Sequence, residues 1–118
     1  MFYVYLIQEY PLESTPFCKV GVTKDPLKRL ESLQQGNPRY LRPYCQLENK
    51  PDCEFGICFE SESDANKFES DLLAALEAEG VRLSRDGGGK LREWLQYPPK
   101  YIWDIMVKQL CSYRKLQN

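Results

Sequence analysis

The chain has 118 residues, of which 42% are hydrophobic and 13% aromatic. This length suits one ordinary domain, and this composition supports a single core and excludes a disordered chain. The net charge is only -1, from 16 basic and 17 acidic side chains, which argues against a basic protein that coats nucleic acid. The chain contains no histidine, so the usual catalytic triads are excluded and any acid–base chemistry must use Tyr, Lys, Glu or Asp.

The charges are divided by segment along the chain. Between Glu60 and Glu79 there are seven acids against the single base Lys67. Four bases stand against one acid between Lys19 and Arg29, and again between Arg82 and Arg92. Because the distribution of charge matters more than its sum, a local basic strip for a nucleic acid remains compatible with the near-neutral total.

The cysteines and the N-terminal segment indicate in which cellular compartment the protein is expected. There are five cysteines, and none forms a CxxC pair, so we expect reduced thiols rather than a zinc or redox site. The run Met1–Ile7 is apolar but lacks the basic region and the cleavage site of a signal peptide. No apolar run is long enough to span a bilayer. We therefore expect a soluble, cytoplasmic protein that has no membrane partner.

The first elements expected in chain order are two strands and a helix. The side chains of residues 2–7, many of them β-branched or aromatic, would alternate between the two faces of a strand. Phe17–Val22 show the same pattern. Two such strands joined by a loop predict an antiparallel hairpin. A helix is expected next: Asp25 is a suitable N-cap, Pro26 suits the first helical position, and Gly36 would end the helix.

The middle of the chain predicts a strand followed by the longest helix. Residues 37–52 are rich in proline and polar groups, so we expect an irregular start there. Residues 53–60 alternate again and predict a third strand. Ser61 can cap a helix over residues 61–79, which carries an apolar stripe at a helical period and ends before Gly80.

The last third predicts one more helix after a glycine-rich loop at residues 84–89. Residues 91–95 suggest a short strand or turn, and residues 98–116 a C-terminal helix opened by two prolines. The whole order predicts one α+β domain over residues 1–118, with a small central antiparallel sheet of about three strands flanked by helices.

Four features of the sequence occur in a recognisable order and spacing. They are Tyr3-Val4-Tyr5, Lys19-Val20-Gly21, Arg29 and Glu69. Together they resemble the GIY-YIG nuclease superfamily over most of residues 3–95. Two further segments are similar to marks of its short phage and bacterial subgroup, which is often described as DNA-binding: Gln35-Gly36-Asn37-Pro38 and Arg92-Glu93-Trp94-Leu95.

The resemblance implies a GIY-YIG-like fold and metal-assisted hydrolysis of phosphodiester bonds. Arg29 would pair with the phosphate, and Glu69 would hold one divalent cation, Mg²⁺ or Mn²⁺. Tyr3, Tyr5 and Lys19 complete the implied catalytic set. Much of the superfamily has a tyrosine at the position of Lys19, so the general base stays open between Tyr5, Tyr3, Lys19 with a depressed pKa, and metal-bound water that loses its proton to solvent.

Each of these residues also has a purely structural interpretation. Glu69 falls at the edge of an apolar helix face, where a carboxylate is costly unless it is metal-bound or paired with a surface base. Arg29 alone would be a solvated helix arginine, and Lys19 an exposed strand lysine. Tyr3 and Tyr5 share one strand face, which also suits packing in the core.

The leading hypothesis is a metal-dependent endonuclease that acts on DNA in a bacterial or phage-infected cell. Its phosphate contacts would come from polar and basic residues outside the catalytic set, which position a strand without distinguishing its sequence. These residues are Lys24, Lys28, Asn37, Arg39 and Arg92. The alternative is a module of the same fold, weakened or inactive in catalysis, that binds nucleic acid, a protein partner or a second copy of itself.

Overall fold

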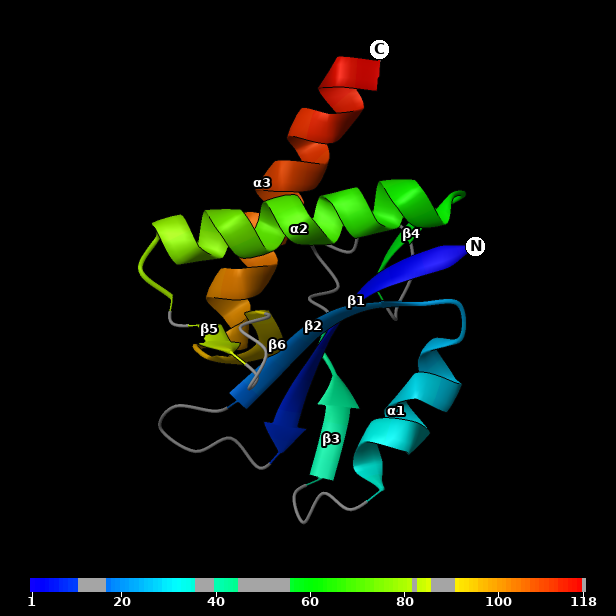
Figure 1. Cartoon of the computed structure of the whole chain (residues 1–118), viewed down its shortest axis with the longest axis vertical. Helices are drawn as coiled ribbons and strands as arrows, with labels where there is room; N and C mark the ends of the chain where they lie inside the picture. The colour runs from blue at the N-terminus through cyan, green and yellow to red at the C-terminus, as the bar shows by residue number, and fades with distance from the viewer. Residues whose placement is uncertain (11–16, 36–39, 45–55, 82, 86–90, 118) are drawn as a thin grey trace.

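A computed structural model of the chain describes residues 1–10, 17–35, 40–44, 56–81, 83–85 and 91–117 (Figure 1). At its centre β1 (Phe2–Tyr10) pairs antiparallel with β2 (Phe17–Thr23), and Tyr5 lies opposite Gly21. This hairpin was predicted, and it places both motif-bearing segments side by side.

Four shorter strands extend the sheet on both sides of this hairpin. The far edge of β1 is shared by β4 (Ile57–Phe59), which pairs with its first residues, and β3 (Tyr40–Pro43), which pairs with its last. Beyond β2 lie β6 (Leu91–Gln96) and then β5 (Leu83–Arg85). All of these pairings are antiparallel.

The helices lie on opposite faces of the sheet. Helices α2 (Glu62–Ala78) and α3 (Pro99–Gln117) bury their apolar residues with Val4 and Val20 in the larger core cluster. Helix α1 (Pro26–Gln34) packs instead against a smaller cluster on the other face. Figure 1 shows α2 crossing one side of the sheet while α1 lies beside β3 on the other.

The larger cluster supplies most of the burial. Its Phe68 and Trp103 are fully buried, and side chains of this kind contribute roughly 1.5–3 kcal/mol each by leaving water. Polar contacts also join the helices: Gln109 Nε2 donates to the carbonyl of Phe68 at 2.8 Å, and the Tyr113 hydroxyl donates to Asp71. Helix α3 is thereby anchored along α2 before its C-terminal end projects past the rest of the molecule (Figure 1).

The predicted α+β class, with a central antiparallel sheet flanked by helices, is confirmed. The three helices also lie where the caps and apolar stripes placed them. Ser61 accepts a hydrogen bond from the backbone N–H of Asp64 at 3.1 Å, as its capping role required. That residues 1–118 form a single domain stays a prediction.

Several expectations about the strands were wrong in detail. Strand β1 continues to Tyr10, because β3 pairs with its last four residues. The segment expected to start irregularly contains β3, and strand β5, Leu83–Arg85, includes the first two residues of the loop expected at residues 84–89. Among the described residues the sheet has six strands, against about three expected. Residues 53–55, the start of the third predicted strand, lie outside the described residues.

No helix in the described part of the chain is long and apolar enough to cross a membrane.

Candidate functional site

One face of the β1–β2 hairpin carries three of the predicted catalytic residues. Residues directly opposite each other in an antiparallel pair share a face, and the face alternates along each strand. The pairs Tyr3 with Thr23, Tyr5 with Gly21, and Ile7 with Lys19 therefore form one row. Val4 and Val20 point the other way into the larger core. The row is the face on which α1 packs.

The turn from β2 into α1 fixes the position of Arg29. The Thr23 hydroxyl accepts a hydrogen bond from the backbone N–H of Asp25 at 3.2 Å. Asp25 then caps the helix, because its Oδ1 accepts from the N–H of Lys28 at 3.1 Å. The N–H of Arg29 closes the first helical turn onto the carbonyl of Asp25 at 3.0 Å. These bonds determine the direction in which the Arg29 side chain leaves the helix.

Arg29 reaches the sheet and contacts Tyr5. Its Nε donates a hydrogen bond to the Tyr5 hydroxyl at 3.3 Å, although 24 residues separate the two. Tyr5 is only 2% exposed, and Arg29 is half-buried. Arg29 is therefore not the fully solvated arginine of the purely structural interpretation. The aliphatic side chains of Leu30 and Leu33 pack beside this contact on the same face.

Lys19 is also buried, at 7% exposure, so the expectation of an exposed strand lysine is wrong. A buried ammonium is costly unless it has compensating partners. Glu9, which is 8% exposed, lies on the same face two residues beyond Ile7, the strand partner of Lys19. Neither charged side chain is isolated in the structure. Glu9 was missed from the sequence because the strand was expected to end before it.

Glu69 comes from the other layer. It is half-buried on α2 beside the buried Leu72 and Leu73, and its Oε2 atom is buried. Helix α2 packs on β1, β2 and β4, so β1 is the element shared by the layer of Glu69 and the layer of Arg29. Tyr5 and Arg29 are thus in direct contact, whereas Glu69 belongs to a helix that packs on the opposite face of the sheet.

The donor chemistry of Glu69 fits a magnesium ion. Among the described residues, no group of three or more Cys, Asp or Glu side chains comes together as a metal site. Mg²⁺ usually keeps several waters and binds through one or two carboxylates together with substrate phosphates. A single glutamate is compatible with that pattern, so Glu69 is the residue that would hold the cation.

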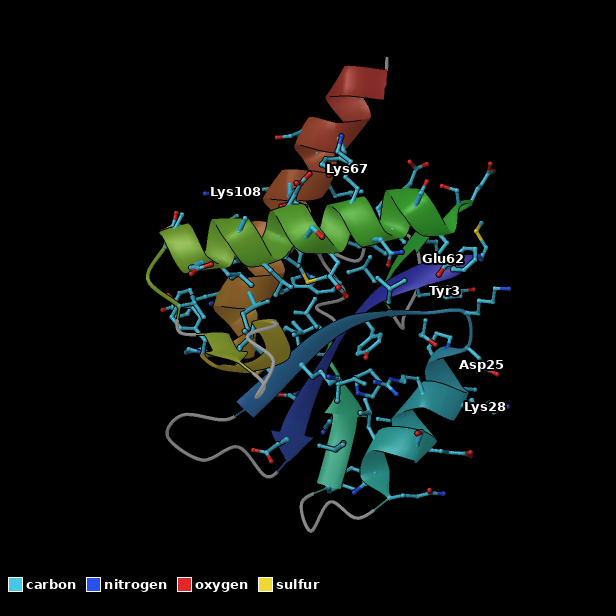
Figure 2. The ribbon with its side chains drawn as sticks, viewed as in Figure 1. Tyr3, Asp25, Lys28, Glu62, Lys67 and Lys108 are labelled. Atoms are coloured by element: carbon cyan, nitrogen blue, oxygen red, sulfur yellow. The ribbon has the colours of Figure 1, made fainter. Side chains whose placement is uncertain are left out.

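The predicted phosphate-binding residues are only partly described. Lys24 and Lys28 are exposed at the start of α1, and the Lys24 ammonium lies 5.3 Å from the centre of the Phe2 ring. Figure 2 shows Lys28 and Asp25 on the outer side of α1. Asn37 and Arg39 lie outside the described residues. Arg92 belongs to β6, and its side chain is not described.

The family follows from a comparison of the whole sequence. A family model described as the T5orf172 domain matches residues 2–111, which include β1, α1 and α2. The chain belongs to the T5orf172 domain family. No curated protein and no solved structure matches it. The Tyr5–Arg29 contact and Glu69 both lie inside the matched T5orf172 domain.

The two layers of this T5orf172 domain differ in charge. The exposed charges on and just before α1 are mixed, with Lys24 and Lys28 beside Asp25 and Glu31, and the half-buried Arg29 adds one more base. The exposed surface of α2 is predominantly acidic, with Lys67 as the only exposed base among its described side chains. Its exposed acids are Glu62, Asp64, Asp71 and Glu77. A polyanion would therefore be repelled by the exposed surface of α2 more than by the mixed surface around α1.

Proposed function

We propose that this T5orf172 domain is a metal-dependent endonuclease of the GIY-YIG type that hydrolyses phosphodiester bonds in DNA. The T5orf172 domain is a phage-associated domain often linked to nuclease-like proteins, which supports the general theme. The observation that carries the proposal is the hydrogen bond between Arg29 and Tyr5. The motif resemblance assigned both residues to one site, and they are in contact.

Arg29 has the chemistry to bind a phosphate in a fixed orientation. A guanidinium carries five N–H donors in a rigid fork that matches phosphate oxygens. Its Nε is held by Tyr5, so the plane of the fork is fixed relative to the sheet. A donor that is fixed before the substrate arrives needs no reorganisation when negative charge develops on the phosphate, and this is how such groups accelerate reactions.

Tyr5 is thus assigned an orienting role, and Lys19 a further positive charge on the same face. Tyr5 is nearly fully buried and its hydroxyl accepts from Arg29, which makes it a poor choice for contact with the attacking water. Tyr3 lies two residues earlier on the same face and is half-buried, so it has more access to solvent. Among the protein groups, Tyr3 is therefore the better choice of general base.

Glu69 would hold the divalent cation. When bound, Mg²⁺ or Mn²⁺ would stabilise the charge that develops on the phosphate oxygens and the leaving oxygen. The Glu69 carboxylate is half-buried beside Leu72 and Leu73, where the loss of hydration is costly for a charged group. A bound cation would offset that cost.

DNA would approach on the side of α1. Lys24 is exposed just before α1, and Lys28 is exposed on α1, the helix that carries Arg29. Lysines of this kind bind the backbone and position the strand without selecting a sequence. The exposed acids of α2 would disfavour an approach from the outer side of that helix, away from the half-buried Glu69.

The test is cleavage of supercoiled plasmid and single-stranded DNA, with Mg²⁺, with Mn²⁺ and with EDTA. Arg29→Ala and Glu69→Ala are compared with the wild type, and Lys108→Ala and Glu77→Gln serve as matched controls on α3 and α2. We expect metal-dependent nicking that is lost in the first two variants and kept in the controls. A wild type that shifts DNA in a gel but never cuts it would instead support the binding module. A wild type that does neither would point to a protein partner.

A further inference from the structure

Gly21 lies directly opposite Tyr5, and the space above its Cα is filled by the Tyr5 ring. A Cβ atom added at Gly21 would stand 2.2 Å from the Tyr5 hydroxyl oxygen and 2.4 Å from the ring carbon that bears it. A second ring carbon, Cε2, would lie at 2.8 Å. The ring therefore crosses β2 at the one residue that has no side chain.

The glycine is needed for space rather than for backbone conformation. The positive-φ glycines among the described residues are Gly56 and Gly80, and Gly21 does not belong to them. An alanine could thus adopt the backbone conformation of Gly21 without strain. The atoms that oppose it are the three Tyr5 atoms, all at the far end of one side chain.

The Tyr5 ring could not give way without losing Arg29. The ring is 2% exposed and packed with Ile7 and Leu41, so an added methyl group would have to push its hydroxyl out of place. The bond from Arg29 Nε is already 3.3 Å long. This length is at the long end for an N–H···O bond, so moving the hydroxyl by about 1 Å away from Nε would break it.

We propose that Gly21 is a positioning residue for the arginine of this site: its missing side chain lets the Tyr5 ring cross β2 and hold the Arg29 guanidinium. Gly21 acts through Tyr5 and touches no substrate. The consequence for cleavage rests on the function proposed above, whereas the effect on the Arg29 side chain does not.

The test uses Gly21→Ala, Tyr5→Phe, Tyr5→Leu and the double variant Gly21→Ala with Tyr5→Leu. Leucine at position 5 removes all three atoms that an alanine at position 21 would meet. The readouts are the NMR signal of the Arg29 Nε–H group, assigned by its loss in Arg29→Lys, and the melting temperature. Gly80→Ala is the control, since its backbone is strained at φ 89° but nothing lies within 4 Å of an added Cβ.

Gly21→Ala should move the Arg29 Nε–H signal toward its position in Tyr5→Phe and should lower the melting temperature. In the Tyr5→Leu background the same substitution should change neither. Gly80→Ala should lower the melting temperature in both backgrounds and leave the Arg29 signal unmoved. If Gly21→Ala alone does not fold, recovery of folding in the double variant supports the proposal.

Two results would overturn it. The first is an Arg29 signal in Gly21→Ala identical to that of the wild type. The second is a drop in melting temperature, or a failure to fold, that is the same in the Tyr5→Leu background. Cleavage is measured in parallel: a wild type that never cuts DNA refutes the proposed function and leaves the NMR and melting results to decide the role of Gly21.

Discussion

The side chain of Arg29 is held by the hydroxyl of Tyr5 at 3.3 Å, although the two residues belong to different elements, helix α1 and strand β1. The contact depends on three separate features of the chain. The register of the hairpin sets Tyr5 opposite Gly21, the Asp25 cap starts the helix, and Leu30 and Leu33 pack that helix onto the sheet.

Removing only the Tyr5 hydroxyl should loosen Arg29 and leave the core intact. A hydrogen bond to a charged group contributes about 1.5–3 kcal/mol, and the length of this one places Tyr5→Phe at about 1–2 kcal/mol of lost stability. Cleavage should slow at saturating DNA while DNA affinity changes little. Urea denaturation and single-turnover cleavage measure the two effects. Tyr101→Phe, at an exposed tyrosine of α3, is the control, and an equal effect there would refute the assignment.

The stability of helix α1 should depend on its Asp25 cap, because none of the described side chains of this helix is fully buried. Asp25→Ala should destabilise the protein by about 1 kcal/mol, the usual cost of losing such a cap. Asp25→Ser keeps an acceptor for the Lys28 N–H but removes the charge, so it should recover most of the stability. If Ser is as destabilising as Ala, the capping bond is not what stabilises the helix. Chemical denaturation of the three proteins supplies the comparison.

DNA affinity should depend on Lys24 and Lys28, just before and within α1, and not on the lysines of α2 and α3. Lys24→Ala and Lys28→Ala should each weaken binding and lower the slope of log affinity against log salt by about 1. Lys67→Ala and Lys108→Ala are the matched controls, because Figure 2 shows both lysines far from Lys28. Fluorescence anisotropy over a range of salt concentrations measures the slope. Equal effects in all four variants would mean that DNA does not prefer the α1 layer.

Stability should fall in alkali through Cys18. Burial, with the nearby Glu9 carboxylate adding to it, raises the pKa of this thiol from 9.0 to about 12. Between these values the unfolded thiol loses its proton and the native one keeps it, so the unfolded state binds fewer protons and stability decreases with rising pH. Below about pH 9 both forms are protonated and this group has no effect.

The matched variant is Cys18→Ala, studied under reducing conditions. The wild type should lose up to about 1.4 kcal/mol more per pH unit than the variant between pH 9 and 11. The pKa of Tyr113 is also raised to about 12, by burial and by its bond to Asp71. Tyr113 is present in both proteins, so its contribution to the pH dependence cancels in the comparison. Parallel curves of unfolding free energy against pH would show that Cys18 ionises equally in both states.

Helix positions followed from local signals in the sequence. Asp25 and Ser61 each precede an apolar stripe, and both accept the capping bond expected of them. Strands β3 and β5 could not be predicted in this way, because such short strands gain their stability from the partner strand. Tyr40–Pro43, for example, is a strand because the end of β1 offers it unpaired backbone groups.

The candidate site shows the same limit. The order of motifs brought Tyr5 and Arg29 into one hypothesis, but neither residue type predicts the contact, since an arginine on a short helix is normally solvated. The burial of Lys19 and Glu9 was not predictable either, because it depends on how α1 and the neighbouring strands cover the sheet. Glu69 at the edge of an apolar helix face was visible in the sequence, and its half-burial agrees with that position.

The most direct test of the proposed activity is single-turnover cleavage of plasmid DNA in Mg²⁺ by Arg29→Lys. Lysine keeps the positive charge but removes both the Nε that contacts Tyr5 and the forked donors. DNA affinity should stay within a few-fold of the wild type, while the cleavage rate at saturating DNA should fall roughly 100-fold or more, as when an oriented donor to the transition state is lost. A cleavage rate equal to that of the wild type would contradict the account, because charge alone, without the guanidinium held by Tyr5, would then suffice.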